Sequence, residues 1–222
     1  TTDGSFNSIS IGKGANSVSG NTVLGEGALD AAVSGINNTA VGKNALTDHT
    51  SGERNAAFGS NSLANNTTGN YNTSIGDSTL FDNTTGSNNT ALGRAALANN
   101  TTANNNVAVG YQALVDNTTG HSNVAVGYVA LDANTTGIKN VAVGANALDA
   151  NTTGGNNTAV GNGALFTNTT GAQLVGIGNG SLSENTTGDY NVAVGSQALE
   201  KNTTASNNTA IGYQALEENT TG

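Results

Sequence analysis

The chain is built from copies of one motif, as in Asn191-Val192-Ala193-Val194-Gly195-Ser196-Gln197-Ala198-Leu199-Glu200-Lys201-Asn202-Thr203-Thr204-Ala205. Position 0 of the motif is the Gly that follows the apolar dipeptide, here Gly195. The spacing from Gly25 to Gly42 repeats unchanged as far as Gly212, in twelve copies with no insertion or deletion, and it gives a 17-residue period. A fixed period this short predicts a solenoid, because one such unit can bury its apolar face only against its neighbours.

Positions −4 to −1 of each copy predict a short strand. The apolar residue at −1 and the Thr or Val at −3 favour β structure, and they alternate with a small residue at −2 and Asn at −4. In Asn191-Val192-Ala193-Val194, one face of the strand carries both Val residues and the other carries Asn and Ala. Since both faces are apolar or small, we expect one to line the coil interior and the other to be covered by a second chain. The alternative is that the small Ala face lies at the surface.

The rest of each coil predicts turns and a core position. The sequence Asn-Thr-Thr-Gly, as at Asn117 to Gly120, is typical of tight turns, and Gly-x-x-Ala and Gly-x-x-Asn predict two corners and two flattened sides per coil. We expect stacked Asn side chains to pair from coil to coil. A Leu at +4 predicts the core ladder, which comprises Leu29, Leu46, Leu63, Leu80, Leu97, Leu114, Leu131, Leu148, Leu165, Leu182, Leu199 and Leu216.

Two segments differ in organisation. Residues 1–24 predict an N-terminal cap or junction coil, because the step from Gly12 to Gly25 is shorter than the regular period and Thr1-Thr2-Asp3-Gly4 resembles the tail of an earlier turn. Residues 25–222 predict the array of twelve 17-residue repeats, the last one truncated. The chain begins without Met and ends on a turn rather than a polar cap. We therefore expect the natural chain to continue, or subunits to join end to end.

Composition excludes several classes of function. The net charge is −9 with only six Lys and Arg, so we expect no nucleic-acid partner. Without a stretch of about 20 apolar residues we expect no membrane insertion, and without Cys there are no disulfides or thiol chemistry. The regular Leu ladder argues against disorder despite the polar, Gly-rich composition.

The sequence predicts no enzyme, no metal site and no cofactor. His49 and His121 are separated in the sequence and have no second ligand beside them. Carboxylates occupy scattered variable positions rather than a paired arrangement.

Two surface functions stay open at this point. Thr recurs at +8 from Thr50 to Thr220, and a flat Thr ladder would suit an ice-binding face. The Asn-Thr-Thr triplets also fit the N-glycosylation pattern, although the same residues are favoured in turns. The candidate acceptors are Asn66, Asn83, Asn100, Asn117, Asn134, Asn151, Asn168, Asn185, Asn202 and Asn219.

Two stretches carry a family resemblance. Ile9-Ser10-Ile11-Gly12-Lys13-Gly14-Ala15 and Thr39-Ala40-Val41-Gly42-Lys43-Asn44-Ala45 resemble the head repeats of YadA-like trimeric autotransporter adhesins. The unit from Asn208 to Leu216 resembles repeat arrays of phage tail fibres. The resemblance implies a left-handed β-roll, a trimer and an extracellular, cell-surface or virion location. The adhesin repeats are a few residues shorter, and the excess here lies in the Asn-Thr-Thr-Gly turn.

These observations predict an all-β protein, a parallel β-solenoid of 17-residue coils that forms a trimeric fibre. The expected function is a structural and adhesive extracellular fibre segment, from a phage tail fibre or a surface adhesin, without catalysis. Its expected partners are copies of itself, as a homotrimer or an end-to-end filament, and a cell-surface receptor or glycan. The alternatives are a filament-forming extracellular protein, with or without glycans, and an ice-binding β-solenoid.

Overall fold

Short strands recur once in every coil of the chain. A computed structural model describes residues 4–7, 9–31 and 33–220. Its contacts divide the chain into two units, residues 1–109 and 110–222. The predicted turn at Thr1 to Asp3 and the last two residues of the final turn, Thr221 and Gly222, lie outside the described residues.

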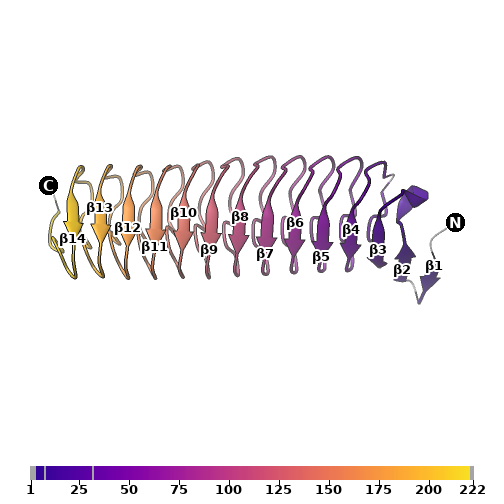
Figure 1. The fold of residues 1–222 in the computed structure, drawn as a ribbon, viewed down its shortest axis with the longest axis horizontal. Helices are drawn as coiled ribbons and strands as arrows, with labels where there is room; N and C mark the ends of the chain where they lie inside the picture. Colours follow the sequence, from indigo (N-terminus) through magenta and orange to yellow (C-terminus); the bar gives the residue numbers. More distant parts are fainter. Residues whose placement is uncertain (1–3, 8, 32, 221–222) are drawn as a thin grey trace. The chain divides into compact units, whose positions relative to one another are not determined.

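The first unit contains two antiparallel pairings followed by parallel coils (Figure 1). Its described elements are β1 Gly4–Phe6, β2 Ile9–Gly12, the 3₁₀ turn η1 Ala15–Ser17, β3 Thr22–Gly25, β4 Thr39–Val41, β5 Ala56–Phe58, β6 Thr73–Ile75, β7 Thr90–Leu92 and β8 Val107–Val109. From β3 onward each strand pairs in parallel with the next, and equivalent positions of the motif lie opposite each other, as in Val41 opposite Phe58.

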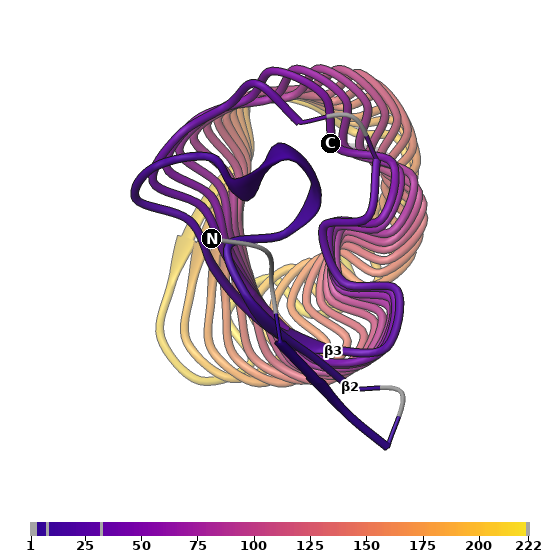
Figure 2. The same ribbon diagram turned by 90° about the vertical axis from the view of Figure 1, so that its right-hand side faces the viewer.

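The first coil of this unit has η1 against its interior. The backbone N–H of Ala15 donates to the carbonyl of Leu29 at 3.0 Å, and Asn16 Nδ2 donates to the carbonyl of Val33 at 3.1 Å. Figure 2 looks onto this end and shows the η1 segment within the outline of the coils. The antiparallel strands and η1 thus distinguish the first residues from the regular coils.

The second unit contains parallel coils throughout its described residues. Its strands are β9 Val124–Val126, β10 Val141–Val143, β11 Thr158–Val160, β12 Val175–Ile177, β13 Val192–Val194 and β14 Thr209–Ile211. The register is again one full repeat, as in Ala142 opposite Ala159. The predicted parallel β-solenoid of 17-residue coils is therefore confirmed. In Figure 1 the parallel strands lie on the near side and run downward, while the chain advances from right to left. Within each unit the winding is therefore left-handed, as the resemblance implied.

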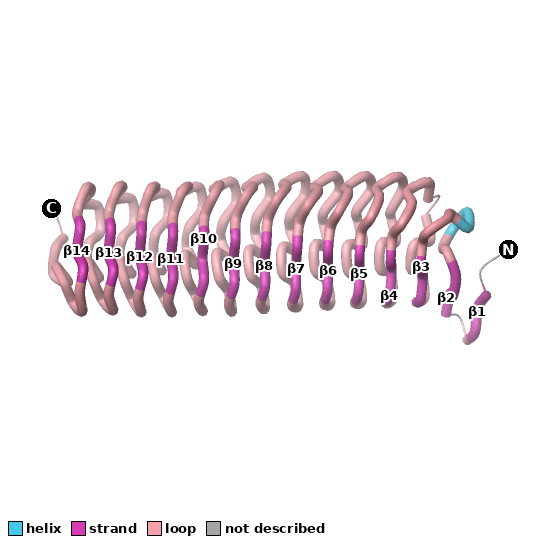
Figure 3. The backbone as a smooth tube through the Cα atoms, viewed as in Figure 1, coloured by secondary structure: helices cyan, strands magenta, loops and turns pink. Residues whose placement is uncertain are grey.

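Each coil contains one strand of three or four residues, and turns make up the rest (Figure 3). The second side of each described coil is not a strand. Its backbone is instead held by hydrogen bonds between equivalent turns, such as Leu63 N–H to the carbonyl of Thr79 at 2.9 Å. A turn that recurs at the same place in every coil can pair with the next coil without extended geometry.

The Leu ladder forms the core, as predicted. Leu29 through Leu199 are fully buried, whereas Leu216 in the last described coil is 54% exposed. These Leu residues adopt a left-handed backbone conformation, with φ of 55° at Leu63. Such a conformation costs a non-glycine residue about 1 kcal/mol or more. Burial of a Leu side chain contributes about 1.5–3 kcal/mol, so the packing offsets the strain.

Position 0 of the motif needs Gly for two reasons. Gly42 has φ of 133°, which side chains disfavour, and a Cβ there would overlap the carbonyl of Gly59 in the next coil. The same close approach repeats between Gly59 and Gly76. The regular Gly is thus required by coil-to-coil packing as well as by the corner.

One face of each strand points into the coil and the other points outward. The Ala at −2 and the Asn at −4 point inward, as at the buried Ala91 and Asn89, whereas −1 and −3 point outward. The alternative that the small Ala face lies at the surface is therefore wrong. The inward-facing Leu ladder already fills the coil, so only a small side chain fits beside it on the strand.

One stretch of the Ala rows in the interior carries hydroxyl groups. Ser62 and Thr79 replace the usual Ala at +3, and Ser74 replaces the usual Ala at −2. Ser62 Oγ donates to Ser74 Oγ at 2.8 Å, and Ser74 Oγ donates to Thr79 Oγ1 at 2.6 Å. All three are fully buried, so the three departures from the repeat form one network with partners for each hydroxyl.

We expect this network to depend on all its members. Ser74→Ala removes the central hydroxyl and should cost about 1–2 kcal/mol, because two buried hydroxyls lose a partner. The triple variant Ser62→Ala, Ser74→Ala, Thr79→Ala restores the repeat and should recover most of that loss. Urea denaturation followed by circular dichroism measures both changes. A triple variant less stable than Ser74→Ala would contradict the prediction.

Candidate functional site

The outward face of the sheet is uncharged in each unit, with an apolar row at −1 and a row of Thr, Val or Ala at −3. Its rows are the residues at −3 and −1, and none of them is charged in any copy. In the first unit Phe58 is 40% exposed and Leu92 45%, and in the second Ile177 is 39% exposed. We call these residues the outer sheet face. Contiguous exposed apolar side chains of this kind are typical of interaction surfaces.

The interior contains two ladders of Asn, as predicted. In the first ladder, at −4, the backbone N–H of Asn55 donates to Asn38 Oδ1 at 2.9 Å, and Asn55 Nδ2 donates to the carbonyl of Gly69 at 2.8 Å. In the second ladder, at +7, Asn83 Nδ2 donates to Asn66 Oδ1 at 2.7 Å. Asn66 Nδ2 also donates to the carbonyl of Gly69, at 3.1 Å. The two ladders therefore meet at one carbonyl, that of Gly69.

The glycosylation candidates are the residues of the second ladder. Their side chains are fully buried from Asn66 to Asn202, and Asn219 is partly buried. A glycan on Nδ2 would replace a hydrogen that these amides donate within the coil, as Asn151 does to Asn134 at 3.0 Å. The folded coils therefore do not accommodate glycans at the buried positions, and the turn interpretation of Asn-Thr-Thr explains these residues.

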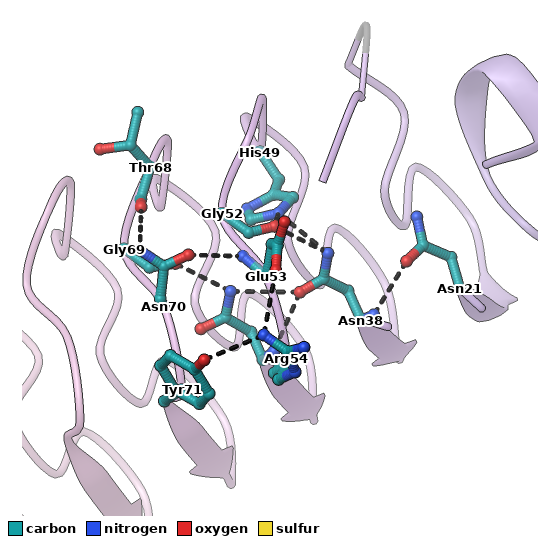
Figure 4. Close-up of polar contacts among 11 residues, drawn as sticks. Asn21, Asn38, His49, Gly52, Glu53, Arg54, Thr68, Gly69, Asn70 and Tyr71 are labelled. Carbon is teal, nitrogen blue, oxygen red and sulfur yellow. Dashed lines mark hydrogen bonds and ion pairs between the residues drawn. The ribbon is translucent and has the colours of Figure 1, made fainter. Parts of the chain in front are cut away.

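The repeat aligns His49 with the Asn of the second ladder, and the structure shows that its ring makes the bonds of that Asn. Its Nε2 lies 2.8 Å from the carbonyl of Gly52, where Asn66 uses its amide N–H. Its Nδ1 lies 3.0 Å from Asn66 Nδ2, where an Asn would accept through Oδ1. The neutral ring with its proton on Nε2 thus reproduces both bonds of the amide. Asn38 Nδ2 also lies 3.2 Å from His49 Nε2, as Figure 4 shows.

The ring of His49 is fully buried, and this environment disfavours its charge. Burial lowers the pKa of His49 below its ordinary value of 6.5, and the carbonyls of Gly52 and Asn66 oppose that shift. A protonated Nδ1 could no longer accept the amide of Asn66. His49 is therefore a structural replacement for Asn.

Three carboxylates lie near one another in the second unit. Burial, together with the charges of Asp116 and Asp149, raises the pKa of Asp132 from 3.8 to about 6. Burial also raises the pKa of Asp149. Asp132 Oδ1 is buried without a hydrogen-bond partner, which accords with a carboxyl that is protonated easily.

The surface positions pair along neighbouring coils. At +1, Lys43 lies 3.6 Å from Glu26, Arg94 lies 3.7 Å from Asp77, and Tyr111 stacks on Tyr128. At −5, the Arg54 guanidinium lies 5.4 Å from the Tyr71 ring centroid and donates to its hydroxyl at 2.9 Å (Figure 4). Variable positions are thus matched to the equivalent residue one coil away.

The two Thr rows differ in their surroundings. The +8 hydroxyls donate to carbonyls of the next coil, as from Thr67 Oγ1 to the carbonyl of Thr84 at 3.0 Å. The +9 residues, such as Thr68 and Thr153, are exposed. The +8 row that the ice-binding alternative used is therefore engaged in coil-to-coil bonds.

The remaining candidate features are His121 and a cavity in the first unit. His121 is exposed, and within the described ranges no group of three or more His, Cys, Asp or Glu side chains is placed to hold a metal ion. Likewise, the described residues contain no helix of the length and apolarity that crossing a membrane requires. A cavity of about 290 Å³ beside η1 is lined by mainly small and polar residues, including Ser10, Asn16 and Asp30.

Compared with protein-family models, curated proteins and solved structures, the chain shows no match. The fold and its surfaces therefore supply the functional argument.

We expect acid to weaken the coil that contains His49. Its pKa is lower in the folded state, so the unfolded chain takes up the proton first as the pH falls. The stability that the neutral ring of His49 contributes to the folded state is present above pH 6.5 and is lost as the pH falls below that value. His49→Asn should remove this loss and restore the ladder. Urea denaturation midpoints of the wild-type protein and of His49→Asn at pH 7 and pH 5 measure this loss. A decrease in midpoint from pH 7 to pH 5 that is equal in the two proteins would contradict the prediction.

Asp132 should have the opposite pH dependence. The pKa of Asp132 is higher in the folded state than in the unfolded chain. Its contribution to the stability of the fold is therefore most favourable at low pH and is lost as the pH rises through about 6. Because the carboxyl is partly solvated, Asp132→Asn should raise stability at pH 7 by on the order of 1 kcal/mol. At pH 4.5 the gain should shrink. The same denaturation experiment measures it, and a loss of stability at pH 7 would refute the expectation.

Proposed function

We propose that this chain is a structural and adhesive segment of an extracellular fibre, in which copies associate through the outer sheet face. The proposal includes no catalysis. It places the fibre at a cell surface or virion, with a receptor or glycan as the external partner.

The observation that carries the proposal is the outer sheet face. Each coil adds two outward side chains to it, and in the strands from Val107 to Val109 and from Val124 to Val126 both are Val. Charged side chains lie at other positions, such as Lys43 and Arg94 at +1, where they are well exposed. A surface without charges, beside surfaces that carry them, is suited to lateral packing.

Identical rows favour copies of the same chain as the partner. Every coil presents the same outward pattern, so two faces that meet in register repeat one contact along each unit. Closed symmetric assemblies bury such a patch on every subunit. The number three rests on the resemblance to trimeric adhesin heads and tail fibres.

The titratable groups support a non-catalytic function. His49 is fully engaged in the interior, and His121 is exposed at a variable position. Asp132 has neighbouring carboxylates but no nucleophile or metal-ligand set beside it among the described residues.

The alternative functions have less support. A glycosylated filament would need accessible amides. The +7 amides from Asn66 to Asn202 are buried, and the exposed acceptors lie in other Asn-x-Thr triplets, such as those of Asn37, Asn88, Asn156 and Asn207. An ice-binding face would need free ordered hydroxyls, and those at +8 donate to backbone carbonyls.

The mass of the particle in solution tests the proposal. Light scattering on a size-exclusion column should give about three times the 21.8 kDa of one chain. The double variant Val143→Lys, Ile177→Lys places two charges on the outer sheet face, and burying them unpaired is costly. It should run as a folded single chain.

The matched control is Thr153→Lys, Thr170→Lys, which adds the same charges in the exposed turns. It should keep the assembled mass. A wild-type mass of one chain would refute the assembly, and large polydisperse particles would indicate end-to-end filaments instead.

A further inference from the structure

A pair of stacked tyrosines marks the surface of the second unit. The rings of Tyr111 and Tyr128 have centroids 5.5 Å apart and an interplanar angle of 11°. Both occupy +1, one coil apart. Tyr128 is 57% exposed although Tyr111 covers one side of its ring.

The next coil leaves room for a third ring. Its +1 residue is Ala145, whose side chain ends at Cβ, and the N–H of Asn146 donates to the carbonyl of Tyr128 at 3.0 Å. The coil after that carries the exposed Asn162, whose Nδ2 lies 3.4 Å from the carbonyl of Ala145. Since coils are spaced at about 4.8 Å, a planar or flat group over Ala145 would continue the stack.

We propose that Tyr128, Ala145 and Asn162 form a binding site for a neutral hexopyranose ring. This inference rests on the proposed adhesive function and specifies the ligand of such a fibre. The sugar would lay its C–H face on Tyr128 and direct its hydroxyls to the Asn162 amide.

The chemistry of the site fits a sugar. An aromatic ring has a negative face, which attracts the polarised C–H groups of a pyranose. Asn162 Nδ2 donates to the carbonyl of Ala145 and its Oδ1 accepts from Asn179 Nδ2, each at 3.4 Å. The second hydrogen on Nδ2 and the second lone pair on Oδ1 are the groups that a sugar hydroxyl would use. The net charge of −9 disfavours sulfated or other acidic sugars, so a neutral one is the better ligand.

The site stays accessible in the proposed assembly. Gly127, with φ of 144°, turns the chain away from β9 immediately before Tyr128. Equivalent +1 positions in the first unit carry charged residues, such as Lys43 and Arg94, which need solvent. The +1 row is therefore not part of the outer sheet face.

Saturation-transfer NMR on the full chain tests the site. The probes are methyl β-D-galactopyranoside and methyl β-D-glucopyranoside. We expect transfer to the ring C–H protons of at least one, with a dissociation constant on the order of 1 mM, as befits so small a ligand.

Two variants remove the site in opposite ways. Tyr128→Ala deletes the stacking face, and Ala145→Tyr fills the space with a residue that +1 already accepts in neighbouring coils. Each should weaken transfer at least tenfold. The control Tyr213→Ala removes another exposed +1 tyrosine and should leave transfer unchanged.

Light scattering on the same samples separates this inference from the proposed function. An assembled protein without transfer, or transfer that persists in Tyr128→Ala and Ala145→Tyr, would overturn the sugar site alone. A single-chain particle that shows Tyr128-dependent transfer would support the site and refute only the assembly.

Discussion

Hydrogen bonding between equivalent residues of successive coils is the constraint on which the structure depends. Each strand and each turn pairs with its equivalent in the next coil, so the Gly, Leu and Asn of the motif mostly stack on copies of themselves. A single insertion would shift Leu, Asn and Gly out of their ladders at once. The strict period from Gly25 to Gly212 follows from this requirement. Stacking also explains the composition, because Gly, Asn, Ala and Thr bond or pack well against themselves at this spacing.

The small interior imposes the second condition. One Leu per coil fills most of it, and most of the remaining inward positions hold Ala or a hydrogen-bonded Asn. The left-handed corners place non-glycine residues at positive φ, among them Arg54, Asn61 and Leu63. Burial and coil-to-coil bonds have to exceed this local strain in every repeat. Where the interior becomes polar, at Ser62, Ser74 and Thr79, three positions change together because an isolated buried hydroxyl is costly.

Much of the fold could be predicted from the sequence, because periodicity reports stacking directly. The 17-residue coil, the Leu ladder and the pairing of Asn amides all followed from it. Which strand face points inward could not be predicted, since alternation identifies two faces without ranking them. The structure assigns the faces, since Ala108 is buried with Leu114 whereas Val109 is partly exposed. The repeat aligns His49 with Asn66, but the replacement of the amide bonds by the ring could not be predicted, because it depends on the positions of two ring nitrogens. The paired surface residues at +1 were visible only once coils were aligned in space.

The ladder through His49 also has a mechanical meaning. When one of the units is pulled along the direction in which its coils stack, its coil-to-coil interfaces carry the load in series. The force at which the first coil detaches is then set by the weakest interface, and the many identical interfaces elsewhere add nothing to it. A coil whose interior bond depends on a neutral imidazole, as between His49 and Asn66, would make that breaking point a function of acidity. Regular repetition gives the array its order, but the weakest interface, and not the number of interfaces, determines its strength.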